Sequence, residues 1–528
     1  MLKFSITRAS LDSGSVEWTW TGHEWRHGAS RIEPYEHPGI CHEMITDGTA
    51  VAVISTERGR GTDAIPGRPP PVRLAPDAYR ARLRAACHGA LDWTAVELTP
   101  RTATVRAGAW AVAPLYLASD NGKLDGSWDL ADLRGHCRAG ALVDREVARV
   151  LRLQHRYTHD TLWEGVHRLT ERSTASWTAD GLALAYPPGA PHTEPRALRP
   201  GADVLDAYEQ LLAQAITRRH FIADHSAVEL SGGMDSANVA AGLTEPDRPD
   251  ITAAAMLLDG EAREQQIRRR KEMISAFGIA RDVCTDVMAH LPLNPAGRRA
   301  NGQAVSPYDD PWTEAEEVMM RALTRAGMWW SFGGTGGDEL TSLRDDERPP
   351  AGEVPTPGPW TGQRTLAVVD HINDGIAPSA VLYDSTLLAF ACRTPQFMRN
   401  GLWPVSPLAD PELIRFAEWL PRPWREHKAL NRLRLVRLGL SPEAVHAPTP
   451  ENFVHAMNAA MRRYVVPFLE SMVREGSVLI DAGFVDGSGL AKTVDSEFLK
   501  GPHGEMDRTL FHIASTEIGL RGMSGVGE

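Results

Sequence analysis

Residues 227–236 read AVELSGGMDS, and this stretch decides the fold expected for the second half of the chain. Its first four residues form a short, largely apolar strand, and a helix is predicted directly after the SGGMDS loop. Two glycines let the loop backbone approach a ligand, and free N–H groups at a helix start bind anions. Ser231 and Ser236 add hydroxyl donors. The stretch therefore predicts a strand–loop–helix unit with an anion site in its loop.

Strands and helices alternate along the chain from residue 204 onward. The apolar residues of 204–216 fall at helical spacing, and later apolar runs alternate between strand and helix lengths. The expected elements are helices at 204–216, 237–243, 262–277 and 314–326, and strands at 227–230, 251–258, 282–287 and 328–332. This alternation indicates a mostly parallel sheet covered by helices. Ligands of such sheets bind beyond the carboxyl ends of the strands, so chemistry is expected in the loops after residues 230 and 332.

The second of these loops, residues 333–339, reads GGTGGDE. Its four glycines again allow close backbone contact, and Asp338 supplies a carboxylate as Asp235 does in the first loop. Carboxylates beside phosphate would repel it unless a magnesium ion lay between, so Asp235 and Asp338 are the expected metal ligands. The first loop lacks the Lys-Ser/Thr ending of a Walker A loop, so γ-phosphate transfer is not implied. The competing interpretation is a Gly-rich turn with Asp338 as a helix cap.

Residues 1–190 indicate a different architecture, made mainly of short strands. Residues 105–117 (VRAGAWAVAPLYL) mix Val, Trp and Tyr with Gly and Pro, and the Asn121-Gly122 pair after them is a hairpin-turn signal. The Pro-rich residues 186–201 cannot continue a helix or a central strand, so we place a domain boundary there. The predicted domains are 1–195 and 196–528.

The composition disfavours several classes of protein. A chain of 528 residues has room for about two to four domains. Its 56 basic and 68 acidic residues give a formal net charge of −12, which argues against nucleic-acid binding. Five cysteines stand far apart without a CxxC pair, which disfavours cysteine-bound zinc and disulfides and favours a reducing cytoplasm. No apolar run approaches the ~18 residues of a membrane span, and we see no signal peptide.

Three motifs give the chain a resemblance to a known family. They are SGGMDS, GGTGGDEL and residues 407–417 (PLADPELIRFA), and they resemble the pyrophosphate loop, the SGEGxDE loop and the PFLDxxLVEFA segment of the asparagine synthetase family. In the N-terminal half, APLY at 113–116, GSWDL at 126–130 and TLWEGVHRL at 161–169 look like segments of the same family.

The resemblance implies an architecture and a site. The fold is α/β and α+β in two domains: an N-terminal class II glutamine amidotransferase-like (Ntn) sandwich and a C-terminal asparagine synthetase-like PP-loop ATP pyrophosphatase domain. ATP and Mg²⁺ are the implied cofactors. The implied nucleotide-binding residues are Leu230, Ser231, Gly232, Gly233, Asp235, Ser236, Met256 and Gly334. The implied metal ligands are Asp235 and Asp338, and the implied catalytic residues are Asp235, Thr335, Asp338 and Glu339.

Two departures from the family pattern narrow the implied activity. The family's glutaminase uses a cysteine directly after the initiator Met, whereas this chain has Leu2 there and its nearest cysteine is Cys41. Release of ammonia from glutamine is therefore not expected. Thr335 stands where asparagine synthetases carry Glu and β-lactam synthetases carry Tyr, and Thr is a poor base at neutral pH. With both departures the chain looks most like a lasso peptide cyclase.

A third departure concerns a lysine that contacts phosphate in the family. The matching stretch, residues 450–453, reads PENF and has no lysine. Only six of the 56 basic residues are lysines, and Lys428 is the nearest in sequence, although a helix face is its expected place. The other candidates are Arg432, Arg434, Arg462 and Arg463. The sequence does not decide among them.

The resemblance implies a macrolactam synthetase. Such an enzyme adenylates an Asp or Glu side chain of a precursor peptide, and the peptide's own α-amine then closes an isopeptide ring. Its expected partners are that peptide, a leader peptidase and a leader-recognition protein, in the cytoplasm. Two alternatives stay open: an amide ligase acting on a small or carrier-bound acid, and an inactive scaffold. The sequence shows no base for the amine, and residues 344–359 fit a lid or an ordinary surface loop equally well.

Overall fold

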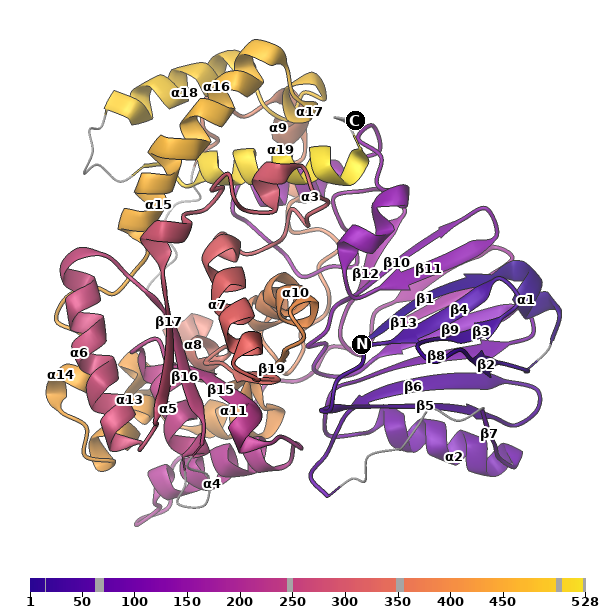
Figure 1. Cartoon of the computed structure of the whole chain (residues 1–528), viewed down its shortest axis with the longest axis horizontal. Coiled ribbons are helices and arrows are strands. Elements are labelled where there is room, and N and C mark those ends of the chain that lie inside the picture. Colours follow the sequence, from indigo (N-terminus) through magenta and orange to yellow (C-terminus); the bar gives the residue numbers. More distant parts are fainter. Residues whose placement is uncertain (15, 62–70, 245–249, 348–355, 500–505, 526–528) are drawn as a thin grey trace.

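The computed structural model describes the chain except for residues 15, 62–70, 245–249, 348–355, 500–505 and 526–528 (Figure 1). The described residues form a mixed α/β structure with two seven-stranded sheets, one five-stranded sheet and many helices. Figure 1 shows the two larger sheets stacked on the right and the five-stranded sheet among helices on the left.

The N-terminal part is a sandwich of the two larger sheets. In order, the first contains β12 (Val166–Leu169), β10 (Leu115–Asp120), β11 (Lys123–Ser127), β1 (Leu2–Thr7), β4 (Ser30–Pro34), β3 (Trp25–His27) and β2 (Thr19–Trp20). The second contains β14 (Gly181–Ala185), β13 (Thr174–Thr178), β9 (Thr102–Ala107), β8 (Trp93–Thr99), β6 (Val51–Glu57), β5 (Ile40–Thr46) and β7 (Val72–Arg73). Phe4, Ile32, Val53 and Val96 belong to the apolar core between them. Helix α2 (Pro76–Cys87) packs against β6 and β8.

The hairpin prediction for this part is confirmed. β10 and β11 pair antiparallel with Asp120 opposite Lys123, so Asn121 and Gly122 form the two-residue turn. Both turn residues have positive φ, 48° and 75°, as a turn that follows the right-handed twist of the strands requires.

The C-terminal part contains the predicted parallel sheet. Its order is β17 (Arg281–Asp286), β16 (Thr252–Leu257), β15 (Ser226–Glu229), β18 (Trp330–Phe332) and β19 (Trp403–Val405), and every pairing is parallel. Each predicted strand is present, with bounds shifted by one or two residues. The helix after the SGGMDS loop, α5 (Met234–Leu243), begins three residues earlier than predicted, so Asp235 and Ser236 lie in its first turn rather than in the loop.

Helices cover this sheet on both faces. α6 (Gly260–Ala276) packs on β16, and α7 (Thr313–Arg325) packs on β16 and β17. Figure 1 shows α6 to the left of the strands, with α7 and α10 (Asp384–Arg399) to their right. Further out, α4 (Val204–Thr217) and α13 (Ala429–Arg437) pack on α5, so α5 is buried from both sides.

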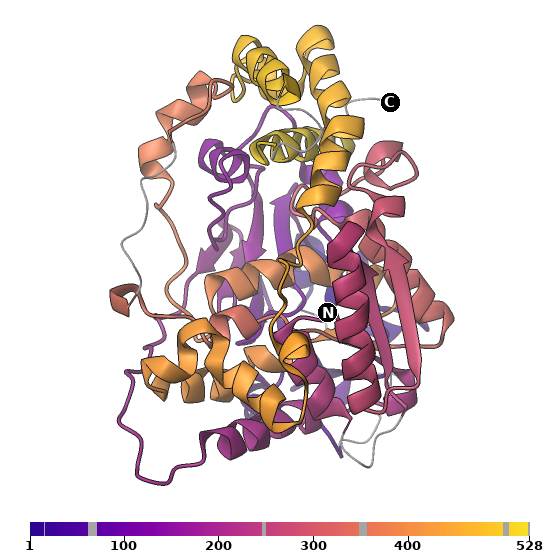
Figure 2. The ribbon, with the colours of Figure 1, turned by 90° about the vertical axis from the view of Figure 1, so that its left-hand side faces the viewer.

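A group of C-terminal helices, which sequence patterns did not predict, lies at one end of both parts (Figures 1 and 2). It comprises α15 (Val454–Ala460), α16 (Val466–Glu475), α17 (Val478–Asp481), α18 (Gly487–Leu499) and α19 (Thr509–Ser524). α19 packs on α3 (Asp144–Leu151) and η1 (Leu130–His136) of the N-terminal part. Among the described residues, no helix combines the length and the apolar character needed to cross a lipid bilayer.

The sandwich and the parallel sheet share one apolar core. Met1 and Trp110 of the sandwich belong to the same buried cluster as Trp330 and Trp403 of the sheet. The buried Arg219 Nε donates to Glu57 Oε1 at 2.9 Å across this contact. The last strand of the sandwich ends at Ala185 and α4 begins at Val204, so the proposed boundary near residue 195 falls in the connection, and the division into two domains stays a prediction.

His37 lies in this shared core. Its Nε2 bonds the Trp329 carbonyl at 2.9 Å, and the Gly39 N–H donates to its Nδ1 at 2.9 Å. The ring also stands edge-on to Trp330, with centroids 5.2 Å apart. Burial lowers the pKa of His37 to about 4, although the bond to the Trp329 carbonyl opposes this, so the ring is neutral at pH 7.

Candidate functional site

The two glycine loops leave neighbouring strands at the point where the order of the sheet reverses. In chain order the strands stand 3-2-1-4-5, and the SGGMDS loop follows the first while GGTGGDE follows the fourth. Connections on the two sides of such a point diverge, which opens a crevice at the carboxyl ends of the strands. The sheet thus brings together the two loops that the sequence singled out.

Close packing explains the glycines of the second loop. A Cβ on Gly334 would lie 3.0 Å from the backbone nitrogen of Ser236, and one on Gly337 would overlap the carboxyl group of Asp235. Gly336 has φ 91°, and a Cβ there would lie 2.9 Å from the backbone of Ala409, in the third motif. All three motifs therefore meet, with Thr335 half-buried among these glycines.

Hydrogen bonds hold the first loop in one conformation. Ser231 Oγ accepts from the Gly233 N–H at 3.2 Å and lies 3.2 Å from Ser236 Oγ. The amide of Gln266 on α6 donates to the carbonyls of Ser231 at 3.0 Å and Met256 at 3.1 Å. Because Gln266 joins the loop to the end of β16, the predicted nucleotide residues on both strands share one support.

Two of the predicted nucleotide residues, Leu230 and Met256, do not present exposed side chains. The side chain of Leu230 is fully buried, and its carbonyl accepts from Arg270 Nε at 2.6 Å. Met256 is half-buried at the end of its strand. Gly232, with φ 95°, is the residue where this loop turns.

Lys428 connects the two expected metal ligands. Its Nζ donates to Asp235 Oδ2 at 2.5 Å and also pairs with Asp338 Oδ1. Asn431 Nδ2 donates to the other oxygen of Asp235 at 2.8 Å, and Tyr208 Oη donates to Asn431 Oδ1 at 2.8 Å. Asp235 is 17% exposed, whereas Asp338 is 82% exposed, so one carboxylate is fixed and the other faces solvent.

The charges in this cluster perturb one another. Burial raises the pKa of Asp235, against the opposing effect of Lys428. Burial also acts against the charge of Lys428, but the two carboxylates outweigh it, and the pKa of Lys428 is raised. The ammonium and the buried carboxylate therefore favour each other's charged form, which makes Lys428 part of the site.

The expectation that Lys428 lies on a helix face is wrong. His427 and Lys428 both have left-handed backbone conformations, with φ of 53° and 56°, and α13 begins only at the next residue. This turn directs the lysine to Asp235. Sequence periodicity could not reveal it because left-handed conformations are rare for such residues. The scarcity of lysine was the signal that could have found it.

The arginine candidates lie elsewhere or have other partners. Arg432 Nε lies 3.3 Å from Met234 Sδ, and Arg434 donates to the backbone and side-chain oxygens of Asn238. Arg462 and Arg463 lie in η9 (Met461–Val465), within the C-terminal helices. None of these contacts involves Asp235 or Asp338.

The segment at 450–453 does reach the first loop, but it brings a carboxylate. A Cβ on Gly232 would lie 3.6 Å from Glu451 Oε2. That oxygen pairs with Arg269 at 2.5 Å, and Gln265 Nε2 donates to the other oxygen at 3.0 Å. The negative charge at this position is thus neutralised by Arg269.

The two carboxylates suit a hard cation whose remaining ligands are water and substrate oxygens. Oxygens of Asp235 and Asp338 converge on one position, which the Lys428 ammonium occupies. Among the described residues, no group of three His, Cys, Asp or Glu side chains could hold a metal. Mg²⁺ commonly binds through one or two carboxylates, with water and substrate phosphates completing its octahedron, so the residues fit a metal that arrives with phosphate.

Two open clefts adjoin this site. The first, of about 440 Å³, is lined by Asp338, Glu339, Tyr383 and Asp384, and Glu339 Oε1 accepts from Ser385 Oγ at 2.5 Å. The second, of about 650 Å³, shares His192 and Tyr383 with it and extends to Arg425. Residues 348–355 of the suggested lid lie outside the described residues. The clefts give the site room for a substrate much larger than a single amino acid.

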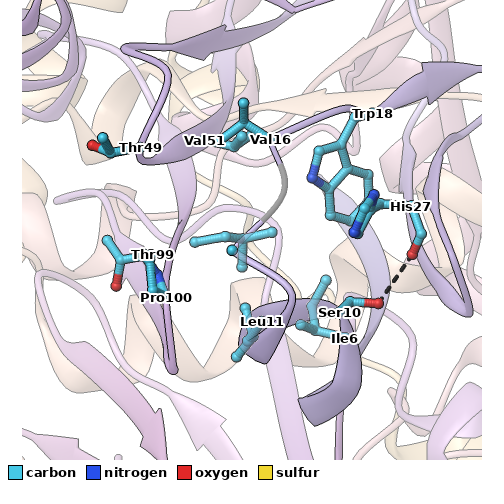
Figure 3. Close-up of a pocket in the computed structure, with 12 residues that line it drawn as sticks. Ile6, Ser10, Leu11, Val16, Trp18, His27, Thr49, Val51, Thr99 and Pro100 are labelled. Carbon is cyan, nitrogen blue, oxygen red and sulfur yellow. Dashed lines mark hydrogen bonds between the residues drawn. The ribbon is translucent and has the colours of Figure 1, made fainter.

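The cavity of the sandwich that Figure 3 shows is far smaller than these two clefts. That cavity measures about 20 Å³ and is lined mainly by Ile6, Leu11, Val16, Trp18 and Val51. The hydrogen bond drawn joins Ser10 Oγ to the His27 carbonyl at 3.1 Å. A volume of this size holds about one water molecule. Leu2, at the position of the family's cysteine, is fully buried in β1.

Comparison with known proteins adds no family to this description. No family model matches the chain, and no curated protein matches it significantly. The resemblance to the asparagine synthetase family therefore stays a prediction that depends on the three motifs.

Proposed function

We propose that the chain is an ATP-dependent, AMP- and pyrophosphate-forming carbon–nitrogen ligase of the asparagine synthetase-like type. The observation that carries this proposal is the convergence of Asp235 and Asp338 on one cation position between two glycine loops. In this proposal the C-terminal part is a PP-loop pyrophosphatase domain, and the sandwich is an amidotransferase-like domain without glutaminase chemistry. Consumption of ATP places the reaction in the cytoplasm.

The first step activates a carboxylate. A carboxylate oxygen of the substrate attacks the α-phosphorus of ATP, the bond to the β-phosphate oxygen breaks, and pyrophosphate leaves. The loop N–H groups and the hydroxyls of Ser231 and Ser236 hold the leaving pyrophosphate. Bound Mg²⁺, held by Asp235 and Asp338, would neutralise phosphate charge. With the metal between the two carboxylates, the Lys428 ammonium would move from that position to the phosphates, in place of the lysine missing from 450–453.

The second step forms the amide. An amine attacks the acyl carbon of the adenylate, and AMP leaves with the electron pair of the C–O bond. We propose that the amine and the acid belong to one precursor peptide, so that the product is a macrolactam. Two adjoining clefts of about 440 and 650 Å³ support a peptide over a small acid. A leader peptidase and a leader-recognition protein are the proposed partners.

One observation favours an inactive binding protein instead. Glu451 brings a carboxylate beside Gly232, where the proposed reaction has phosphate oxygens. Its pairing with Arg269 reduces the repulsion, which is why the enzyme is the preferred proposal. Activity of the purified protein decides between them.

The test uses ATP, Mg²⁺ and synthetic linear peptides that have a free α-amine and an internal Asp or Glu. Two matched peptides are the controls: an N-acetylated one, which can be adenylated but not cyclised, and one with Asn or Gln at the acid. We expect pyrophosphate release with the free peptide and the N-acetylated peptide only. Mass spectrometry should show the loss of one water from the free peptide alone. Pyrophosphate release with small acids alone would favour an amide ligase that acts on a small acid. No pyrophosphate release under any condition would overturn the proposal.

A further inference from the structure

The Pro-rich connection that the sequence marks as a domain boundary forms a wall of the substrate clefts. Ala190 N–H donates to the Ser379 carbonyl at 2.6 Å, and Arg196 N–H donates to the Trp419 carbonyl at 2.8 Å. The Arg196 guanidinium also lies 4.5 Å from the centre of the Trp419 ring. The segment is therefore tied to the C-terminal part on both sides of His192.

His192 lies where the two clefts meet. It lines both of them, together with Tyr383, and its side chain is 41% exposed. The ring centroids of His192 and Tyr383 are 5.7 Å apart. Asp338, from the proposed nucleotide site, lines the same 440 Å³ cleft. An imidazole thus lines the same cleft as a carboxylate of the proposed nucleotide site.

A largely buried carboxylate contacts this imidazole. His192 Nδ1 bonds Glu418 Oε1 at 2.5 Å, and the Glu418 side chain is only 9% exposed. The other oxygen, Oε2, accepts from the Thr193 N–H at 3.0 Å and from Thr193 Oγ1 at 2.9 Å. Because Thr193 holds the carboxylate beside Nδ1, this contact favours the tautomer of the neutral ring that has its proton on Nδ1 and its lone pair on Nε2. Within the described residues Nε2 has no hydrogen-bond partner, so that lone pair is available.

This arrangement has the parts of a general base. A proton acceptor in a cleft, held in one tautomer by a buried carboxylate, is what deprotonation of an attacking nucleophile needs. Thr335, at the position of the family's Glu or Tyr, cannot serve at neutral pH. We infer that His192, positioned by Glu418, is the base that takes the proton from the attacking amine. This inference rests on the proposed function, because it assigns a residue to its second step.

Amide formation couples one proton transfer to the departure of AMP. The neutral amine forms the N–C bond to the acyl carbon, its N–H proton passes to His192 Nε2, and the C–O bond to AMP breaks. The imidazolium is stabilised by Glu418 and later loses its proton to water. The other charged residues that line the clefts are Asp338, Glu339 and Asp384 on the first and Glu194, Arg344, Asp346 and Arg425 on the second. Arg344 pairs with Glu194, and Arg425 donates to Glu347 at 2.5 Å, so the carboxylates of the first cleft remain to attract an amine.

The experiment separates the two half-reactions in the full-length protein. ATP–pyrophosphate exchange with the N-acetylated peptide measures adenylation alone. Hydroxylamine, a nucleophile that is unprotonated at neutral pH, traps the acyl-adenylate as a hydroxamate without a base. Macrolactam formation from the free peptide measures the complete reaction. The variants are His192→Ala and Glu418→Gln, and the control is His88→Ala, which changes an exposed histidine of the sandwich.

For His192→Ala we expect exchange and hydroxamate formation within about twofold of the wild type, and macrolactam formation reduced about 100-fold or more. Its remaining lactam activity should rise to higher pH than in the wild type, because water or hydroxide must then accept the proton of the attacking amine. Glu418→Gln should show a smaller loss with a shifted pH profile.

Two results would overturn the inference. If exchange and lactam formation fell together in His192→Ala, the residue would have a structural role, and unchanged lactam formation would exclude it from the step. In both cases the wild type would still catalyse exchange, and the proposed function would stand. Absence of exchange in the wild type would overturn the proposed function and, with it, the base.

Discussion

The sandwich and the parallel sheet use their strands in opposite ways. In the sandwich, strands of up to seven residues pair side by side, and the cavity drawn in Figure 3 is about 20 Å³. In the parallel sheet, β18 and β19 have only three residues each, and the loops that follow the strands bring charged side chains together. Closed antiparallel layers provide stability, whereas short parallel strands that end at one edge provide a place for chemistry. The variants below test this division of roles.

The largest effect is expected for Asp235→Asn. The change removes a carboxylate charge from the cation position while keeping the size of the side chain. ATP–pyrophosphate exchange should fall on the order of 1,000-fold or more, with an unchanged circular dichroism spectrum. Asp180→Asn, in the exposed turn between β13 and β14, is the matched control and should keep full activity. Near-normal exchange in Asp235→Asn would remove the basis of the metal assignment.

Lys428→Met should have the next largest effect. Without the ammonium, the buried Asp235 loses its ion pair and the phosphates lose a positive charge, so exchange should fall roughly 100-fold. Lys428→Arg should retain more activity, because it keeps the charge but changes its geometry. Lys123→Met, on β11 of the sandwich, is the control. Equal activity in all three variants would show that Lys428 has no part in the reaction.

Gly337→Ala tests the contact between the loops. The added methyl group would displace the carboxyl group of Asp235, since the two would overlap. Exchange should fall about tenfold, with a loss of stability of about 1–3 kcal/mol, as for other overpacked sites. Gly140→Ala adds a methyl group where nothing lies within 4 Å and should change neither quantity. Exchange that is equal in the two variants would argue against a rigid contact.

In the sandwich, a substitution in the core should lower stability without lowering activity. Phe4 is buried between the sheets, so Phe4→Leu should lower the free energy of unfolding by about 1 kcal/mol. Exchange per folded molecule should stay within about twofold of the wild type. Urea unfolding and an exchange assay on the same preparation measure both. A large loss of exchange in fully folded protein would mean that the sandwich takes part in the chemistry.

The last effect appears only as a dependence on pH and concerns the contact between the two parts. Because the pKa of His37 is about 4 when folded and ~6.5 when unfolded, the unfolded chain binds more protons below pH 6.5. Its contribution to stability is complete above pH 6.5 and is lost as the pH falls toward 4. In His37→Gln, the stability difference between pH 7 and pH 5 should shrink by about 2 kcal/mol, as measured by urea unfolding. His23→Gln, at an exposed histidine, should leave this stability difference unchanged. If the difference were unchanged in both variants, His37 would not be a source of the pH dependence.

Local patterns predicted the elements but not all of the site. Strand positions around Ala227 and Phe332 follow from apolar runs, and the Asn121-Gly122 turn follows from local backbone preference. The position of Lys428 depends on two left-handed residues, for which the sequence contains no local signal. The function of 186–201 as a cleft wall depends on backbone bonds to residues more than 180 positions away. Long-range pairing of this kind is invisible to periodicity.

The core shared by the sandwich and the sheet has a consequence for how the protein can be made. Trp330 and Trp403 of the sheet are covered in part by His37 and Tyr35, which come from the N-terminal part. Residues 196–528 synthesised alone would present this aromatic surface to water and would be prone to aggregation. The sandwich strands therefore act as a permanent folding partner within the same chain, one that has to be retained even though the groups assigned to the proposed reaction come from the connection that holds His192 and from the C-terminal part.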